Sequence, residues 1–154
     1  MKDENKADLT SKEDLAIAVM NLISIEEHLS FTVMKTGKKE YLHILGSVRK
    51  LRIGLMKSLL NNTEGELWCI SKHLLAATMR QMETATKYID ADGEKAHEIL
   101  KGAFGAYGLF WLLQKSGDDA KGVLKVLKDL GKKGAWKKKV SKTLKEILEC
   151  CFEK

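Results

Sequence analysis

Apolar side chains recur along most of this chain at the three- and four-residue spacing that places them on one face of an α-helix. Four such stretches cover residues 10–36, 39–60, 66–89 and 94–114, and short turns marked by glycine or asparagine separate them. Helices joined by short links pack as antiparallel neighbours. The sequence therefore predicts an all-α fold with an up-down four-helix bundle over residues 10–115.

Two segments flank this predicted bundle. Residues 1–9 are polar, and we expect a disordered N-terminal tail there. Beyond residue 115 the apolar periodicity resumes and predicts two additional C-terminal helices, the second over about residues 135–152. Residues 116–154 are thus expected to form a helical appendage that packs on the bundle or on a partner. The chain contains no proline, which agrees with a helical fold because proline interrupts helix interiors.

Composition points to one soluble domain of 154 residues. The polar start lacks the apolar region of a secretory signal, and no window approaches the ~18 uninterrupted apolar residues of a membrane span, so neither is expected. The three cysteines are Cys69, Cys150 and Cys151, an odd number with an adjacent pair, which is not typical of a disulfide framework. These features favour a cytoplasmic protein.

Charged residues fall inside the apolar stripes of the first two predicted helices. Glu26 lies in the first stripe, and Arg52 lies in the second with Arg49 on its flank. An unpaired buried carboxylate is costly, so we expect Glu26 to pair with Arg49 or Arg52. Gln81 or Tyr107 is expected to take a remaining hydrogen bond. This buried polar cluster is either an ion pair that fixes helix register or a polar pocket for a small ligand.

The third predicted helix has an outward face that could contact another subunit or protein. Cys69 and His73 are four residues apart there, which is a possible spacing for metal ligands, but no second cysteine pair accompanies them and no zinc site is expected. The candidate interaction face consists of Trp68, Cys69, Lys72, His73 and Arg80. The alternative is an ordinary solvated helix surface.

Lysine is concentrated near the C-terminus, where residues 131–142 hold six lysines and no acidic residue. Clustered lysines beside an aromatic ring can bind a phosphate backbone, with Trp136 stacking on an exposed base. The candidate phosphate-binding residues are Lys132, Lys133, Trp136, Lys137, Lys138, Lys139 and Lys142. The other interpretations are a solvated face of the appendage or a contact with an acidic protein, and a membrane partner is not expected.

Two Glu-x-x-His motifs, at residues 40–43 and 94–97, resemble the metal-binding motif of ferritin-like di-iron bundles. That resemblance implies a metal-binding bundle in which Glu26 and Glu83 supply further ligands. However, His43 and Glu83 lie on the polar arcs of their predicted helices. The sequence therefore predicts no metal site and no cofactor.

No catalytic arrangement is evident either. The chain lacks a Walker A motif and a glycine-rich loop after a strand, and no nucleophile-base pair is indicated. We therefore expect a non-catalytic interaction module that associates with itself or with a protein partner. The alternatives are a nucleic-acid-associated protein acting through residues 131–142 and a ferritin-like metal-binding bundle.

Overall fold

The computed structural model describes residues 2–61, 63–115 and 142, and over these residues the regular structure is helical. Helix α1 spans Lys2–Thr36, α2 spans Glu40–Leu59, α3 spans Gly65–Thr86 and α4 spans Gly93–Lys115. The all-α class is thus confirmed, and α2, α3 and α4 begin and end within three residues of their predicted bounds. The two predicted C-terminal helices lie outside the described residues.

Helix α1 begins earlier than the sequence pattern predicted. It starts at Lys2 rather than Thr10, so residues 2–9 continue the helix and do not form the expected disordered tail. These residues are mostly good helix formers, and no glycine or proline stops the helix before Thr10. Lys12 and Asp8 add an i,i+4 ion pair of 3.1 Å across the predicted boundary.

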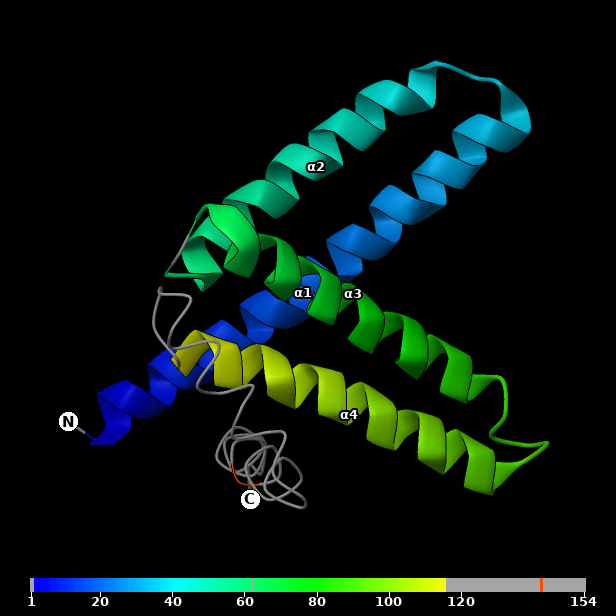
Figure 1. Ribbon diagram of the computed structural model, residues 1–154. Helices are drawn as coiled ribbons and strands as arrows, with labels where there is room; N and C mark the ends of the chain where they lie inside the picture. The colour runs from blue at the N-terminus through cyan, green and yellow to red at the C-terminus, as the bar shows by residue number, and fades with distance from the viewer. Residues whose placement is uncertain (1, 62, 116–141, 143–154) are drawn as a thin grey trace.

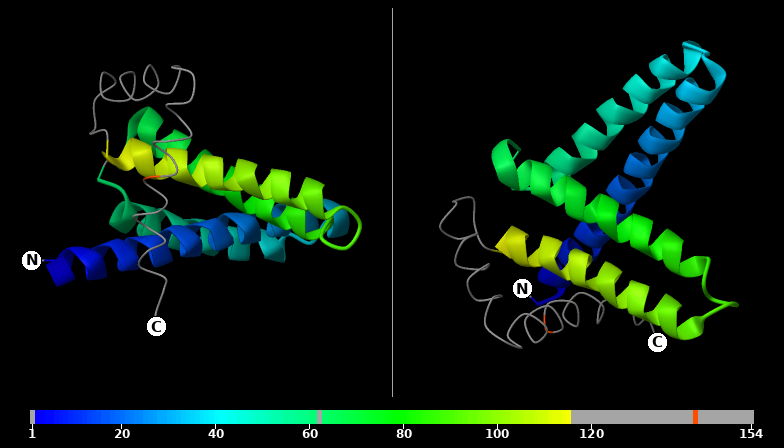
Figure 2. Two further views of the ribbon diagram at one scale, coloured as in Figure 1. Left: turned by 90° about the horizontal axis from the view of Figure 1, so that it is seen from below. Right: turned by 45° about the vertical axis from the view of Figure 1, so that its right-hand side comes forward.

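The four helices form two antiparallel hairpins, α1–α2 and α3–α4, which are stacked as two layers (Figure 2). The hairpins cross at an angle, and α1 is the helix that packs against both α2 and α3 (Figure 1). The predicted up-down bundle, with neighbouring helices aligned throughout, is therefore not confirmed. Helical periodicity identifies the apolar face of a helix but does not fix the angle at which two hairpins cross.

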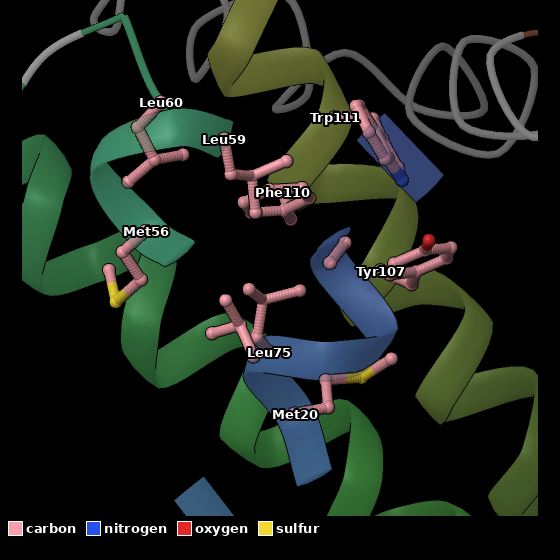
Figure 3. Packing of buried hydrophobic residues seen from close by; sticks show 10 residues of the cluster. Met20, Met56, Leu59, Leu60, Leu75, Tyr107, Phe110 and Trp111 are labelled. Carbon is pink, nitrogen blue, oxygen red and sulfur yellow. The ribbon is translucent and has the colours of Figure 1, made fainter. Parts of the chain in front are cut away.

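The hydrophobic core lies where the two hairpins cross (Figure 3). Its aromatic part comes from α4, where Phe110 and Trp111 meet edge to face with ring centroids 5.0 Å apart. Such a pair contributes about 0.5–1.5 kcal/mol beyond the burial of its surface. The buried cluster comprises Ala16, Val19, Met20, Met56, Leu59, Leu60, Leu75, Tyr107, Phe110 and Trp111. The crossing therefore joins all the described helices.

Beyond the crossing, the α1–α2 hairpin projects away from α3–α4 (Figure 1). Its turn is made at Gly37, which has a φ of 66° and whose N–H donates to the carbonyl of Val33 at 2.8 Å. Glycine enters this left-handed region without the penalty that a Cβ imposes. The turn is therefore tight, and it brings the projecting half of α2 back alongside α1.

Candidate interaction surface

The interior of the α1–α2 hairpin contains the ion pair that the stripe positions predicted. Arg52 Nε donates to Glu26 Oε1 at 2.6 Å, and Arg52 Nη2 donates to Glu26 Oε2 at 3.2 Å. The Arg52 side chain is 3% exposed and that of Glu26 is 17% exposed. The third nitrogen, Nη1, donates to Met56 Sδ at 3.6 Å. This two-point geometry fixes the relative position of the two helices and is a structural contact.

The other three residues of the predicted polar cluster lie elsewhere. Arg49 is exposed on α2. The Gln81 side chain donates to the carbonyl of Ala77 within α3 at 3.3 Å. Tyr107 lies in the aromatic core, with its ring 6.0 Å from that of Trp111. The structure therefore brings together two of the five residues, and the picture of a larger polar pocket around Glu26 is corrected to a single ion pair.

The predicted interaction face on α3 is likewise divided. Cys69 and His73 are exposed and Lys72 is half-buried, but Trp68 packs against the hydrophobic core. Arg80 turns towards α1, where it makes the contacts described below. The five residues therefore do not form one open face, because α3 packs against α1 as well as α4.

Arg80 links the two hairpins. Its Nη2 donates to Ser24 Oγ at 2.6 Å, and its Nε lies 3.5 Å from Glu27 Oε2. Both partners belong to α1, and the side chains of Arg80 and Glu27 are less than half exposed. Arg80 thus joins α3 to α1, and 44% of its side chain stays exposed.

The two Glu-x-x-His motifs lie at the first turns of α2 and α4, which belong to different hairpins (Figure 1). All four side chains, of Glu40, His43, Glu94 and His97, are exposed. Among the described residues, no group of three or more histidine, cysteine or acidic side chains is placed to hold a metal ion. The structure therefore does not assemble the ligand set that the ferritin-like resemblance implies.

The predicted phosphate-binding segment, residues 131–142, lies outside the described residues except for Lys142, which is exposed. The hypothesis that this segment binds nucleic acid therefore stays a prediction.

One face of the α1–α2 hairpin carries an open, mainly apolar groove that the sequence reading missed. Leu51 stands at this groove with 63% of its surface exposed, beside Gly54, where a Cβ would meet nothing within 4 Å. The groove is lined by Ala18, Asn21, Leu22, Ser47, Lys50, Leu51, Gly54 and Leu55. Small side chains and glycine line the groove together with the exposed side chain of Leu51. We call this surface the hairpin groove.

Exposed large apolar side chains are concentrated on the same hairpin. Of the ten among the described residues, six lie between residues 25 and 51, namely Ile25, Phe31, Met34, Leu42, Ile44 and Leu51. Helical phase could have revealed part of this surface, because Leu42, Ile44 and Leu51 fall outside the inward stripe of α2. Large exposed apolar areas of this kind mark interaction sites.

Three more of these exposed side chains surround a smaller hollow between α1, α3 and α4. Ile17, Met82 and Phe104 are 43–46% exposed at its lining, and Glu13 and Tyr107 lie within the same lining. This hollow belongs to the crossing of the hairpins and adjoins the core.

Helix α1 carries more apolar surface than the fold covers. Its residues Thr10–Thr36 are long and apolar enough to cross a membrane by length and composition, although no such span was expected from the sequence. Only 17% of the apolar window is buried. Thr10–Thr36 holds four acidic residues, of which Glu26 and Glu27 are each paired with an arginine of another helix. The excess apolar surface of α1 therefore calls for an explanation outside the described contacts.

No protein-family model matches this chain, and no curated protein or solved structure matches it either. The surfaces described above are therefore the basis for assigning a function.

Proposed function

We propose that this protein is a non-catalytic interaction module that associates with a second copy of itself through the hairpin groove. The observation that carries the proposal is that one groove presents both a 63% exposed apolar side chain, Leu51, and the small residues Gly54 and Ser47. A twofold dimer uses the same patch on both subunits, so that patch must be complementary to itself. Leu51 of one copy can enter the groove of the other.

Gly54 supports a close contact at this face. It lies in the interior of α2, where glycine costs about 1 kcal/mol relative to alanine. A Cβ at this position would meet nothing within 4 Å, so no contact inside the chain requires glycine. The approach of a helix from a second copy would require it, because glycine allows two helix backbones to come closer together.

The hairpin groove also carries little charge, so an interface can bury it at low cost. Of the eight lining residues, Lys50 is the only one with a charge, and its long side chain can keep the ammonium group in water. Two hairpins joined in this way would place four helices side by side. The up-down four-helix arrangement predicted for one chain would then be completed between two chains.

Sedimentation velocity of the full chain tests this proposal. We expect a concentration-dependent dimer, and we expect Leu51→Glu to weaken it by roughly 30-fold or more, since burying a charge at the centre of an interface costs at least about 2 kcal/mol. Ile89→Glu is the matched control, because Ile89 is 60% exposed but lies after α3, outside the groove. A wild-type monomer at about 100 μM, well above ordinary dimer affinities, would overturn the proposal.

A glycine pair refines the same test. Gly46 and Gly54 both lie within α2, and a Cβ at either one meets nothing within 4 Å, but only Gly54 lines the groove. Gly54→Ala should weaken the dimer about tenfold, a loss of about 1.4 kcal/mol, while Gly46→Ala should leave it unchanged. Equal affinities of the two variants would remove Gly54 from the interface.

The lysine-rich segment 131–142 supports nucleic-acid association as a second candidate function. The two functions differ in salt dependence: phosphate binding by six lysines weakens steeply as salt rises, whereas an apolar contact between hairpins does not. Nuclease-sensitive material that accompanies the protein at low salt and is released at high salt would favour this second candidate. The free, exposed thiol of Cys69 supports a reducing, cytoplasmic setting for either function.

A further inference from the structure

We propose that the tip of the α1–α2 hairpin, residues 31–42, binds to an anionic membrane surface. This inference goes beyond the proposed function, because it concerns the end of the hairpin rather than the hairpin groove on its face. The tip comprises the last turn of α1, the loop at Gly37 and the first turn of α2.

The first observation is the exposure of large apolar side chains at this end. Met34 is 81% exposed, the highest value among the exposed large hydrophobic residues, and Phe31 and Leu42 are 53% and 47% exposed. All three lie within six residues of Gly37 in the sequence. A side chain such as Met34 has no packing role in the described fold, but it can enter the boundary between lipid headgroups and acyl chains.

The second observation is the charge around these side chains. Lys35, Lys38 and Lys39 are exposed at the tip, and Glu40 is its single acidic residue. Lysines beside exposed apolar groups are the combination by which proteins bind anionic leaflets. The charge complementarity therefore selects lipid headgroups of negative charge rather than a neutral surface.

The third observation is the position of the tip in the molecule. The loop at residues 37–39 lies at the far end of the projecting hairpin, well separated from the α3–α4 loop (Figure 1 and the right-hand view of Figure 2). A flat surface can therefore meet the tip before it meets the rest of the described fold. The most exposed of these side chains, Met34, is aliphatic and suits acyl chains better than stacked bases, although Phe31 also offers a ring at 53% exposure.

The test is co-sedimentation of the full chain with vesicles of phosphatidylcholine, alone or mixed with phosphatidylserine. We expect binding to the mixed vesicles and much weaker binding to phosphatidylcholine alone. Lys35→Gln, Lys38→Gln and Lys39→Gln together should lower the partition coefficient about 100-fold, because each lysine near an anionic surface adds to the free energy of membrane binding. Met34→Glu should lower it at least tenfold, which corresponds to about 1.4 kcal/mol.

Matched controls separate the tip from the rest of the chain. Ile89→Glu changes a 60% exposed apolar side chain outside the tip, and Lys72→Gln, Lys87→Gln and Lys101→Gln together remove as many charges outside the tip. Both controls should bind within twofold of the wild type. Leu51→Glu, which targets the dimer, should still bind vesicles, so failure of the dimer proposal is distinguishable from failure of this one.

Three outcomes would overturn the inference. One is no binding to phosphatidylserine vesicles at low salt. The second is binding that the tip variants leave intact, which would assign the vesicles to another part of the chain such as residues 131–142. The third is binding of polyglutamate but not of vesicles, which would identify an acidic protein as the partner. Circular dichroism of each variant should show unchanged helix content, since the substituted tip side chains are exposed.

Discussion

Helices α2 and α4, one from each hairpin, have similar lengths but bury very different numbers of residues. Helix α4 has 23 residues, of which eight are buried, whereas α2 has 20 residues, of which three are buried. The buried residues of α2 are Arg52, Met56 and Leu59, all in its second half next to the crossing. Helix α4 is thus the most committed to the fold, whereas α3 buries four of its 22 residues and the first half of α2 leaves its surface free for other molecules.

The hairpins also differ in the kind of interaction that they contribute. Helix α4 contributes an aromatic cluster of Tyr107, Phe110 and Trp111 to the core. At the centre of α1–α2 stands the Glu26–Arg52 ion pair. Apolar packing supplies stability without fixing a single register, whereas a two-point ion pair is satisfied in one register only. The ion pair therefore suits the α1–α2 hairpin, which keeps its shape although its projecting part packs against no other described helix.

The largest loss of stability should come from a substitution in the aromatic core. Phe110 is fully buried, so Phe110→Ala should lower the free energy of unfolding by about 3–5 kcal/mol. Met34→Ala, at the 81% exposed position on the projecting hairpin, should change it by less than about 0.5 kcal/mol. Urea unfolding followed by circular dichroism measures both. Similar losses in the two variants would contradict the division between a committed and a free hairpin.

Breaking the Glu26–Arg52 ion pair should give the next largest loss of stability. Arg52→Met leaves the carboxylate of Glu26 without its partner and should cost about 3 kcal/mol, at the lower end for a broken buried pair because Glu26 retains some exposure. Adding Glu26→Leu should restore most of that loss, since an apolar pair of similar size fills the same space. A double variant as unstable as the sum of the two single variants would show that the residues act separately.

Much of the local structure was predictable from the sequence. Periodicity and the short turns gave the helices of each hairpin, and the apolar stripes predicted that Glu26 pairs with Arg49 or Arg52, of which the structure shows Arg52. These are contacts within one hairpin, where sequence distance determines height along the helices. The start of α1 at Lys2 was missed because nothing in the sequence stops the helix at Thr10.

How the two hairpins pack against each other could not be predicted from periodicity and turns. Arg80 was expected on an open face, but it binds Ser24 and lies beside Glu27 on α1. Which side of α3 meets α1 depends on the crossing angle of the two hairpins, and that angle follows from packing of the whole core. The hairpin groove was missed for a related reason, although Gly54 within a helix was a visible signal of close approach.

The smallest expected change in stability concerns two glycines that lie inside helices, Gly54 and Gly102. Gly54→Ala adds a Cβ in open space, so at concentrations where the chain is monomeric it should raise the free energy of unfolding by about 1 kcal/mol. At Gly102 the new Cβ would collide with the side-chain oxygen of Gln81, whose amide donates to the carbonyl of Ala77 at 3.3 Å. Gln81 would have to move and give up that hydrogen bond, so Gly102→Ala should gain at most about half as much.

Thermal unfolding of the two alanine variants against the wild type measures this difference. A smaller gain at Gly102 means that its glycine is used inside the chain, where α4 meets Gln81 of α3. A full gain at Gly54 means that its glycine has no such use within the described fold, as the proposed contact with a second copy requires. If Gly102→Ala gained as much as Gly54→Ala, the two hairpins would not differ in this respect, and Gly54 would lose its value as a sign of an external partner.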